Sequence, residues 1–189
     1  MPQDTKKRIL DKIRNLEKER SDWFVKEETI QLIMQYCKQG DFKEVLEIGT
    51  HIGYSALHLA LVADHITTIE KDKIFIVEAR RNLKKFKKEI TLIEANALDI
   101  LSILNEANKK YDCIFIDANK PDYAEFLRLS IPLLSDNGVI FIDNTISHKK
   151  KVPGFFPALK KSGLSYKELN VGDGLIIALK TRKFFQTKQ

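Results

Sequence analysis

The sequence predicts a doubly wound α/β fold, in which helices cover both faces of a mostly parallel, seven-stranded sheet. Five short apolar runs alternate with helical segments, and each run is continuously hydrophobic, as in strands buried on both faces. A Gly-Asp-Gly turn then joins two further strand-like segments, which predicts a C-terminal antiparallel hairpin. At 189 residues the chain suits a single domain, residues 1–189.

The expected elements follow one another in a regular order. Ile9, Leu10, Ile13 and Leu16 recur at helical spacing, which predicts an N-terminal accessory helix within residues 1–22, packed on the outside of the domain or on a partner subunit. The parallel strands are expected at 44–48, 65–69, 90–93, 113–116 and 139–142, and the hairpin strands at 165–170 and 174–180. The other helices are expected at 27–39, 53–62, 73–86, 98–108 and 122–134.

Composition and charge narrow the classes of function. No apolar run approaches the roughly 20 residues of a membrane span, and the first ten residues lack the apolar stretch of a signal peptide, so we expect a cytoplasmic protein. Cys37 and Cys113 lie in apolar segments and are expected to be buried thiols. The net charge of +6 favours a polyanionic partner such as RNA, although dispersed lysines also serve simply as a solvated surface.

The turn after the first strand predicts a nucleoside site, because ligands bind beyond the carboxyl ends of such strands. Gly49 permits a sharp turn and close approach to a ligand, and Gly53 lets the next helix start against the strand. The Glu-x-Gly-x-x-x-Gly spacing differs from the Gly-x-Gly-x-x-Gly of dinucleotide enzymes, and the carboxylate of Glu47 suits a cationic sulfonium instead. Glu70, after the second strand, can accept hydrogen bonds from ribose hydroxyls. A purely structural glycine turn is the alternative.

Acidic and amide side chains follow the fourth and fifth strands. Asp117, Asp143 and Asn144 together offer three hard oxygen ligands, which suit Mg²⁺ or another divalent cation. Lys120 stands three residues after the first of them. The alternative is that the two aspartates only cap the helix or loop that follows.

These motifs, in this order and spacing, resemble those of the catechol O-methyltransferase-like family of class I S-adenosylmethionine (SAM)-dependent enzymes, including its small bacterial members. The resemblance covers about residues 25–180. The matching pieces are residues 45–55 (VLEIGTHIGYS), 69–72 (IEKD), 111–120 (YDCIFIDANK), Tyr123, 138–144 (GVIFIDN) and 172–175 (GDGL).

The resemblance implies a Rossmann-like fold, a homodimer and specific roles for individual residues. Lys120 would be the general base that takes the proton of the substrate hydroxyl. The divalent metal would be held by Asp117, Asp143 and Asn144. The SAM cofactor would be contacted by Val25, Glu47, Gly49, His51, Ser55, Glu70, Asn96, Ala97 and Asp117.

The chain departs from the family pattern in three places. Asn96 replaces a common carboxylate, which puts the adenine contact in doubt, and Asn119 stands where a second Asp is usual. Residues 145–166 are short and basic where relatives carry a longer substrate loop.

We therefore expect a metal-assisted O-methyltransferase that acts on a hydroxyl beside a second oxygen, as in a catechol-like small molecule. A tRNA 5-hydroxyuridine presents the same chemistry, and Lys149, Lys150 and Lys151 beside His148 suit a phosphate backbone or a solvated loop. A non-catalytic SAM- or RNA-binding protein and a nicotinamide-dependent oxidoreductase are the alternatives from other classes.

Overall fold

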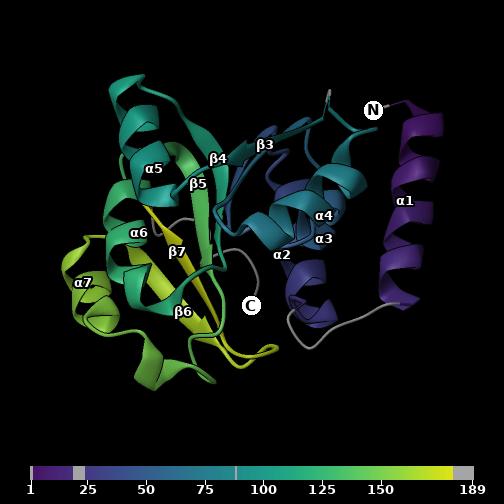
Figure 1. Ribbon diagram of the computed structural model, residues 1–189. Helices are drawn as coiled ribbons and strands as arrows, with labels where there is room; N and C mark the ends of the chain where they lie inside the picture. Colours follow the sequence, from purple (N-terminus) through teal and green to yellow (C-terminus); the bar gives the residue numbers. More distant parts are fainter. Residues whose placement is uncertain (1, 19–23, 88, 181–189) are drawn as a thin grey trace.

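The computed structural model describes residues 2–18, 24–87 and 89–180, and it contains a seven-stranded sheet of order β3-β2-β1-β4-β5-β7-β6 (Figure 1). The strands are β1 (Glu44–Ile48), β2 (His65–Glu70), β3 (Ile90–Glu94), β4 (Tyr111–Ile116), β5 (Leu134–Ile142), β6 (Ser165–Leu169) and β7 (Leu175–Leu179). The first five strands pair in parallel, whereas β7 runs antiparallel to β5 and β6. The predicted fold class, including the C-terminal hairpin, is confirmed.

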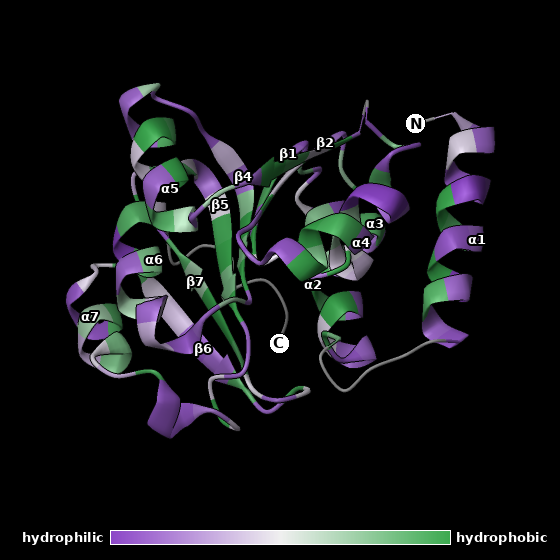
Figure 2. Ribbon diagram, viewed as in Figure 1, coloured by the Kyte–Doolittle hydropathy of each residue, from purple (hydrophilic) through white to green (hydrophobic). Residues whose placement is uncertain are grey.

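Helices cover both faces of the sheet (Figure 1). The α-helices are α1 (Gln3–Lys18), α2 (Glu27–Gln39), α3 (Tyr54–Leu59), α4 (Lys73–Leu83), α5 (Ala97–Glu106), α6 (Tyr123–Ser130) and α7 (Phe155–Lys161), and the 3-10 helices are η1 (Lys120–Asp122) and η2 (Lys149–Lys151). Val45 and Cys113 face a core shared with α1 to α4, whereas Leu46 and Ile114 face a second core beneath α5 to α7. Because successive strand residues point to opposite faces, the inner strands are mostly apolar, and much of β4, β5 and β7 is green in Figure 2.

Helix α1 lies outermost on one side of the sheet and packs on α3 (Figure 1). Its buried residues are Ile9, Ile13 and Leu16, three of the four apolar positions that predicted an amphipathic helix. The apolar stripe is therefore covered by its own domain, so it gives no support to the predicted homodimer. Residues 19–22 of the predicted accessory helix lie outside the described residues.

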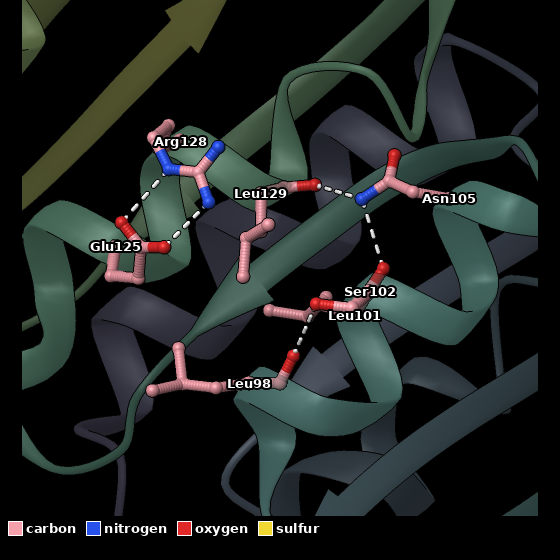
Figure 3. Close-up of polar contacts among 7 residues, drawn as sticks. All are labelled: Leu98, Leu101, Ser102, Asn105, Glu125, Arg128 and Leu129. Atoms are coloured by element: carbon pink, nitrogen blue, oxygen red, sulfur yellow. Dashed lines mark hydrogen bonds and ion pairs between the residues drawn. The ribbon is translucent and has the colours of Figure 1, made fainter.

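Two polar side chains form hydrogen bonds to the backbone of neighbouring elements and so link those elements together. The carboxylate of Asp112 on β4 accepts hydrogen bonds from the backbone N–H groups of Lys43 (2.9 Å) and Glu44 (3.1 Å), which ties β4 to the start of β1. On the opposite face, the Nδ2 of Asn105 donates to the carbonyl oxygens of Leu101 and Leu129, each at 2.9 Å, and so links α5 to α6 (Figure 3).

The structure differs from the predicted elements mainly between residues 130 and 166. Helix α6 ends at Ser130 and β5 already begins at Leu134, because the extension pairs with Tyr111 across an irregular register. Helix α7 lies inside the segment predicted as a loop, where the buried Phe155 packs edge-on against Tyr123. No helix among the described residues is long and apolar enough to cross a bilayer.

Candidate active site

The turn after β1 is pressed against the end of β4. Gly49 has φ +104°, a conformation that favours glycine, and a Cβ at this position would lie 2.1 Å from the carbonyl oxygen of Asp117. Its N–H donates to the carbonyl oxygen of Ile69 (3.0 Å). The glycine therefore lets the β1 turn, the end of β2 and the end of β4 converge, because the carbonyl oxygen of Asp117 stands where a side chain would otherwise lie.

Glu47 is fully buried beneath this turn. The hydroxyl of Thr68 donates to its Oε2 at 2.5 Å, and Thr50 contacts the same hydroxyl at 2.6 Å. Burial raises the pKa of Glu47 to about 8, against the opposing effect of the hydroxyls of Ser55 and Thr68. A cation bound nearby would favour the ionised carboxylate. Thr68 was missed by the sequence analysis, although a threonine in a run of buried apolar residues is itself a signal.

Glu70 joins the end of β2 to the β1 turn. Its Oε2 accepts a hydrogen bond from the N–H of His51 (2.8 Å), and its Oε1 accepts from the N–H groups of Lys71 and Asp72, both at 2.9 Å. A carboxylate has about four lone-pair sites, so acceptor capacity is left after these three bonds. The side chain is thus held in one orientation and can still receive a hydroxyl.

An aromatic wall borders the turn. Phe24 stacks on Tyr54 with ring centroids 4.7 Å apart, and the ring of His51 lies 5.9 Å from Phe24 and 4.1 Å from Phe75. Val25 is buried beside Phe24. The structure thus brings His51 into one aromatic cluster beside Val25, and it adds Phe24, Tyr54 and Phe75, to which the sequence analysis gave no role.

Asn96 is the N-cap of α5, and its Oδ1 accepts a hydrogen bond from the N–H of Leu98 (3.1 Å). Asn and Asp are comparably good N-caps, so the replacement of the usual carboxylate leaves this local structure intact. Helix α5 accordingly begins at Ala97, one residue earlier than predicted.

Asp117 and Asp143 stand side by side at the carboxyl ends of β4 and β5. Their preceding residues, Ile116 and Ile142, are register partners, and the N–H of Asp143 donates to the carbonyl oxygen of Ile116 (3.0 Å). Asp143 is 1% exposed, and neither of its carboxylate oxygens has a hydrogen-bond partner among the described residues. Burial and then the charge of Asp117 raise its pKa to about 7, against the opposing effects of the Asn144 backbone and then of Lys120. A buried carboxylate without partners fits a cation site, since bonding to a cation would offset its desolvation.

Asn144 and Lys120 complete this edge. Asn144 has φ +62°, and a left-handed residue here turns the chain sharply at the end of β5. The Nζ of Lys120 lies 2.9 Å from the Oδ1 of Asp117 and donates to the hydroxyl of Tyr123, also at 2.9 Å. Asn119, the second departure from the family pattern, donates to Asp122 (2.8 Å) and closes the η1 turn that carries Lys120.

The Gly-Asp-Gly turn covers the loop that follows Asn144. The carbonyl oxygen of Asp173 accepts hydrogen bonds from the N–H groups of Ile146 (3.2 Å) and Ser147 (3.0 Å). Burial and then the charges of Lys151 and Lys120 lower the pKa of the next residue, His148, so this imidazole faces the same charged edge as Lys120. Asp173 lies beside the loop that follows Asn144, and its charge adds to the rise in the pKa of Asp143; the sequence analysis gave Asp173 no role.

Comparison with known proteins shows the family to which this chain belongs. Residues 5–154 match the model of a family described as O-methyltransferase. The chain belongs to the O-methyltransferase family. Among the curated relatives of this O-methyltransferase family member, a catechol O-methyltransferase of Niastella koreensis is 31% identical over 127 residues, which cover 64% of this chain and 56% of that protein. The chain therefore spans little more than half of that relative.

Solved structures share the fold over nearly the whole chain. A Staphylococcus aureus protein provisionally assigned as a caffeoyl-CoA O-methyltransferase is 31% identical, with a TM-score of 0.76 and coverage of 93% of this chain and 99% of that one. An O-methyltransferase from Bacillus cereus, solved in complex with SAH (S-adenosylhomocysteine), is 22% identical with a TM-score of 0.75 and coverage of 94% and 91%. At that identity the second likeness is one of fold alone.

Proposed function

We propose that this chain, acting as a single domain, is a SAM-dependent, divalent-metal-assisted O-methyltransferase that methylates a hydroxyl beside a second oxygen on a small molecule. The observation that carries the proposal is the buried carboxylate of Asp143, which has no described partner and lies next to the Asp117–Lys120 pair. Burying a carboxylate without a partner costs free energy, and a protein that only bound a nucleoside would not need it. Family membership supports the same reaction class.

The methyl donor would rest on the turn after β1. Glu70 would accept the ribose hydroxyls, Asn96 and Ala97 would flank the adenine, and Gly49 would allow its backbone to approach. Glu47 and the carboxylate of Asp117 would face the sulfonium charge. The further predicted contacts are the side chains of Val25, His51 and Ser55.

The reaction needs one proton removed and one methyl group moved. With its Nζ in the unprotonated amine form, Lys120 would take the proton of the substrate hydroxyl; the substrate oxygen would form the new O–CH₃ bond and release SAH as the S–CH₃ bond breaks. Asp117, Asp143 and Asn144 would hold the divalent cation, which when bound lowers the pKa of a coordinated hydroxyl and fixes its oxygen. The hydroxyl of Tyr123 and the Oδ1 of Asp117 both contact the Nζ of Lys120 and would hold it in place.

A tRNA 5-hydroxyuridine is the second candidate substrate. The η2 lysines, Lys149 to Lys151, are exposed on the loop after Asn144 and could follow a phosphate backbone. Lys149 instead lies over the ring of Phe156, 5.0 Å from its centroid, as a lysine on an ordinary surface also does. We therefore rank the small molecule first.

Methyl transfer from isotope-labelled SAM tests the proposal. The full chain is incubated with catechol or with bulk tRNA, in Mg²⁺ or in EDTA. We expect methylated catechol only with Mg²⁺, and loss of that product in Asp143→Asn. Asp136→Asn is the matched control, because Asp136 lies on the same strand with its side chain 99% exposed. Methylated tRNA alone would favour the second substrate, and no product with either would favour a non-catalytic binding protein.

A further inference from the structure

A second cluster of metal-binding side chains lies between α1, α2 and α3. Glu17, Glu27 and His58 each present a ligand atom within 4.8 Å of the other two. They line a cavity of about 380 Å³ together with residues of α1 and α2. The proposed methyltransferase reaction uses none of these three residues.

His58 is oriented as a metal ligand. Its ring is 4% exposed, and its Nδ1 lies 3.0 Å from the carbonyl oxygen of Tyr54, so Nδ1–H donates there and the Nε2 carries the lone pair. Metal-bound histidines commonly fix their ring in this way, with the second nitrogen donating to a backbone carbonyl. No hydrogen bond to Nε2 is found among the described residues, so this nitrogen is free to coordinate.

Within residues 2–18, 24–87 and 89–180, the two carboxylates also lack a counter-ion. The hydroxyl of Tyr54 lies 3.3 Å from the Oε1 of Glu17 and 3.4 Å from the Oε2 of Glu27, and the Nε2 of Gln31 donates to the Oε1 of Glu27 (2.8 Å), so these neighbours supply neutral hydrogen bonds and no positive charge. Lys6, Arg14 and Lys38 line the same cavity, yet within the described part of the chain no ion pair joins any of them to either glutamate. A cation between the carboxylates would balance their charge.

We propose that Glu17, Glu27 and His58 form a zinc site that fastens α1 to α2 and α3. One imidazole with two carboxylates suits Zn²⁺ better than Mg²⁺, which prefers oxygen ligands throughout. Ligands of a tetrahedral zinc lie about 3.3 Å apart, given bond lengths of about 2.0–2.1 Å. The glutamates must therefore move inward, and both are exposed enough to do so, while the buried imidazole stays fixed.

Zinc titration against a chromophoric chelator tests the site. The full chain is used in an Asp143→Asn background with excess Mg²⁺, so that the other candidate metal site does not contribute. We expect one equivalent of Zn²⁺, not displaced by millimolar Mg²⁺, and a melting temperature raised by Zn²⁺ because the ion binds the folded state. Glu17→Gln and Glu27→Gln should each weaken zinc binding about tenfold or more.

Glu28→Gln is the matched control, because Glu28 is exposed on the same turn of α2 but does not belong to the cluster. It should bind zinc as the parent does. His58→Ala should lose binding, and if that variant does not fold, the two glutamate variants still decide the result. Absence of zinc binding, competition by Mg²⁺, or unchanged affinity in Glu17→Gln and Glu27→Gln would overturn the site. These outcomes are independent of methyl transfer.

Discussion

The carbonyl oxygen of Asp117 occupies the position that a side chain on Gly49 would need, with only 2.1 Å between that oxygen and a Cβ built on the glycine. This contact joins the turn proposed to hold the methyl donor to the residue proposed to hold both donor and metal. A substitution of Gly49 should therefore affect both the proposed binding of the methyl donor and the proposed metal site.

Replacing Gly49 with Ala should destabilise the chain by about 1–3 kcal/mol or more, because strained backbone and a steric clash coincide. Urea unfolding measures the loss, and calorimetry with SAH measures the accompanying loss of affinity. Gly154→Ala is the control: its φ is also positive, at +72°, but a Cβ there meets nothing within 4 Å. Equal effects of the two substitutions would show that the contact with Asp117 is unimportant.

The raised pKa values of Asp143 (about 7) and Glu47 (about 8) predict an unusual dependence of stability on pH. Unfolded carboxyl groups titrate near pH 4, so between pH of about 4 and 7–8 the folded chain holds protons that the unfolded chain has released. The free energy of unfolding should therefore fall as pH rises through this window, by up to about 1.4 kcal/mol per pH unit for each group.

Urea unfolding in EDTA from about pH 5 to pH 8 measures this slope. Asp143→Asn should flatten it mainly below pH 7, and Glu47→Gln should flatten it up to about pH 8, since each removes one titrating group. Added Mg²⁺ should oppose the fall in the parent chain. A stability that rises with pH in EDTA would contradict the burial that raises the pKa of these two carboxylates.

Glu70→Gln should weaken SAH binding about tenfold, because an amide has one acceptor oxygen where the carboxylate has two and hydrogen bonds to charged groups are the stronger ones. Calorimetric titration measures the change. Glu94 is a well-matched control, since it is the register partner of Glu70 on β3 and pairs with Arg80. If Glu94→Gln weakened SAH binding as much as Glu70→Gln, the assignment of Glu70 to the ribose would fail.

Lys120→Ala should lower kcat by about 10²–10⁴-fold, the range typical of a lost general base, while SAH affinity stays near that of the parent. Rates at saturating substrate separate this effect from substrate binding. Lys110→Ala is a suitable control, because the Nζ of Lys110 contacts only the carbonyl oxygen of Pro132 among the described residues. Full activity in Lys120→Ala would assign the base role to another group.

The sequence by itself determined the sheet and the edge that carries the chemistry. The central parallel strands β1 and β4 are buried on both faces, so their apolar runs are almost continuous, and β1 and α2 begin and end where the pattern predicts. Because the carboxyl ends of parallel strands share one edge, Glu47, Asp117 and Asp143 could be placed near one another from their positions alone. The roles predicted for these residues stay predictions until the variants are measured.

Only the tertiary structure decided the contacts between residues far apart in the chain. The early start of β5 depends on pairing with Tyr111, and α7 depends on a place for Phe155 beside Tyr123. Glu17 and His58 come together only because α1 folds back onto α3. Periodicity reports which face of an element is apolar, but it carries no information on which distant element covers that face.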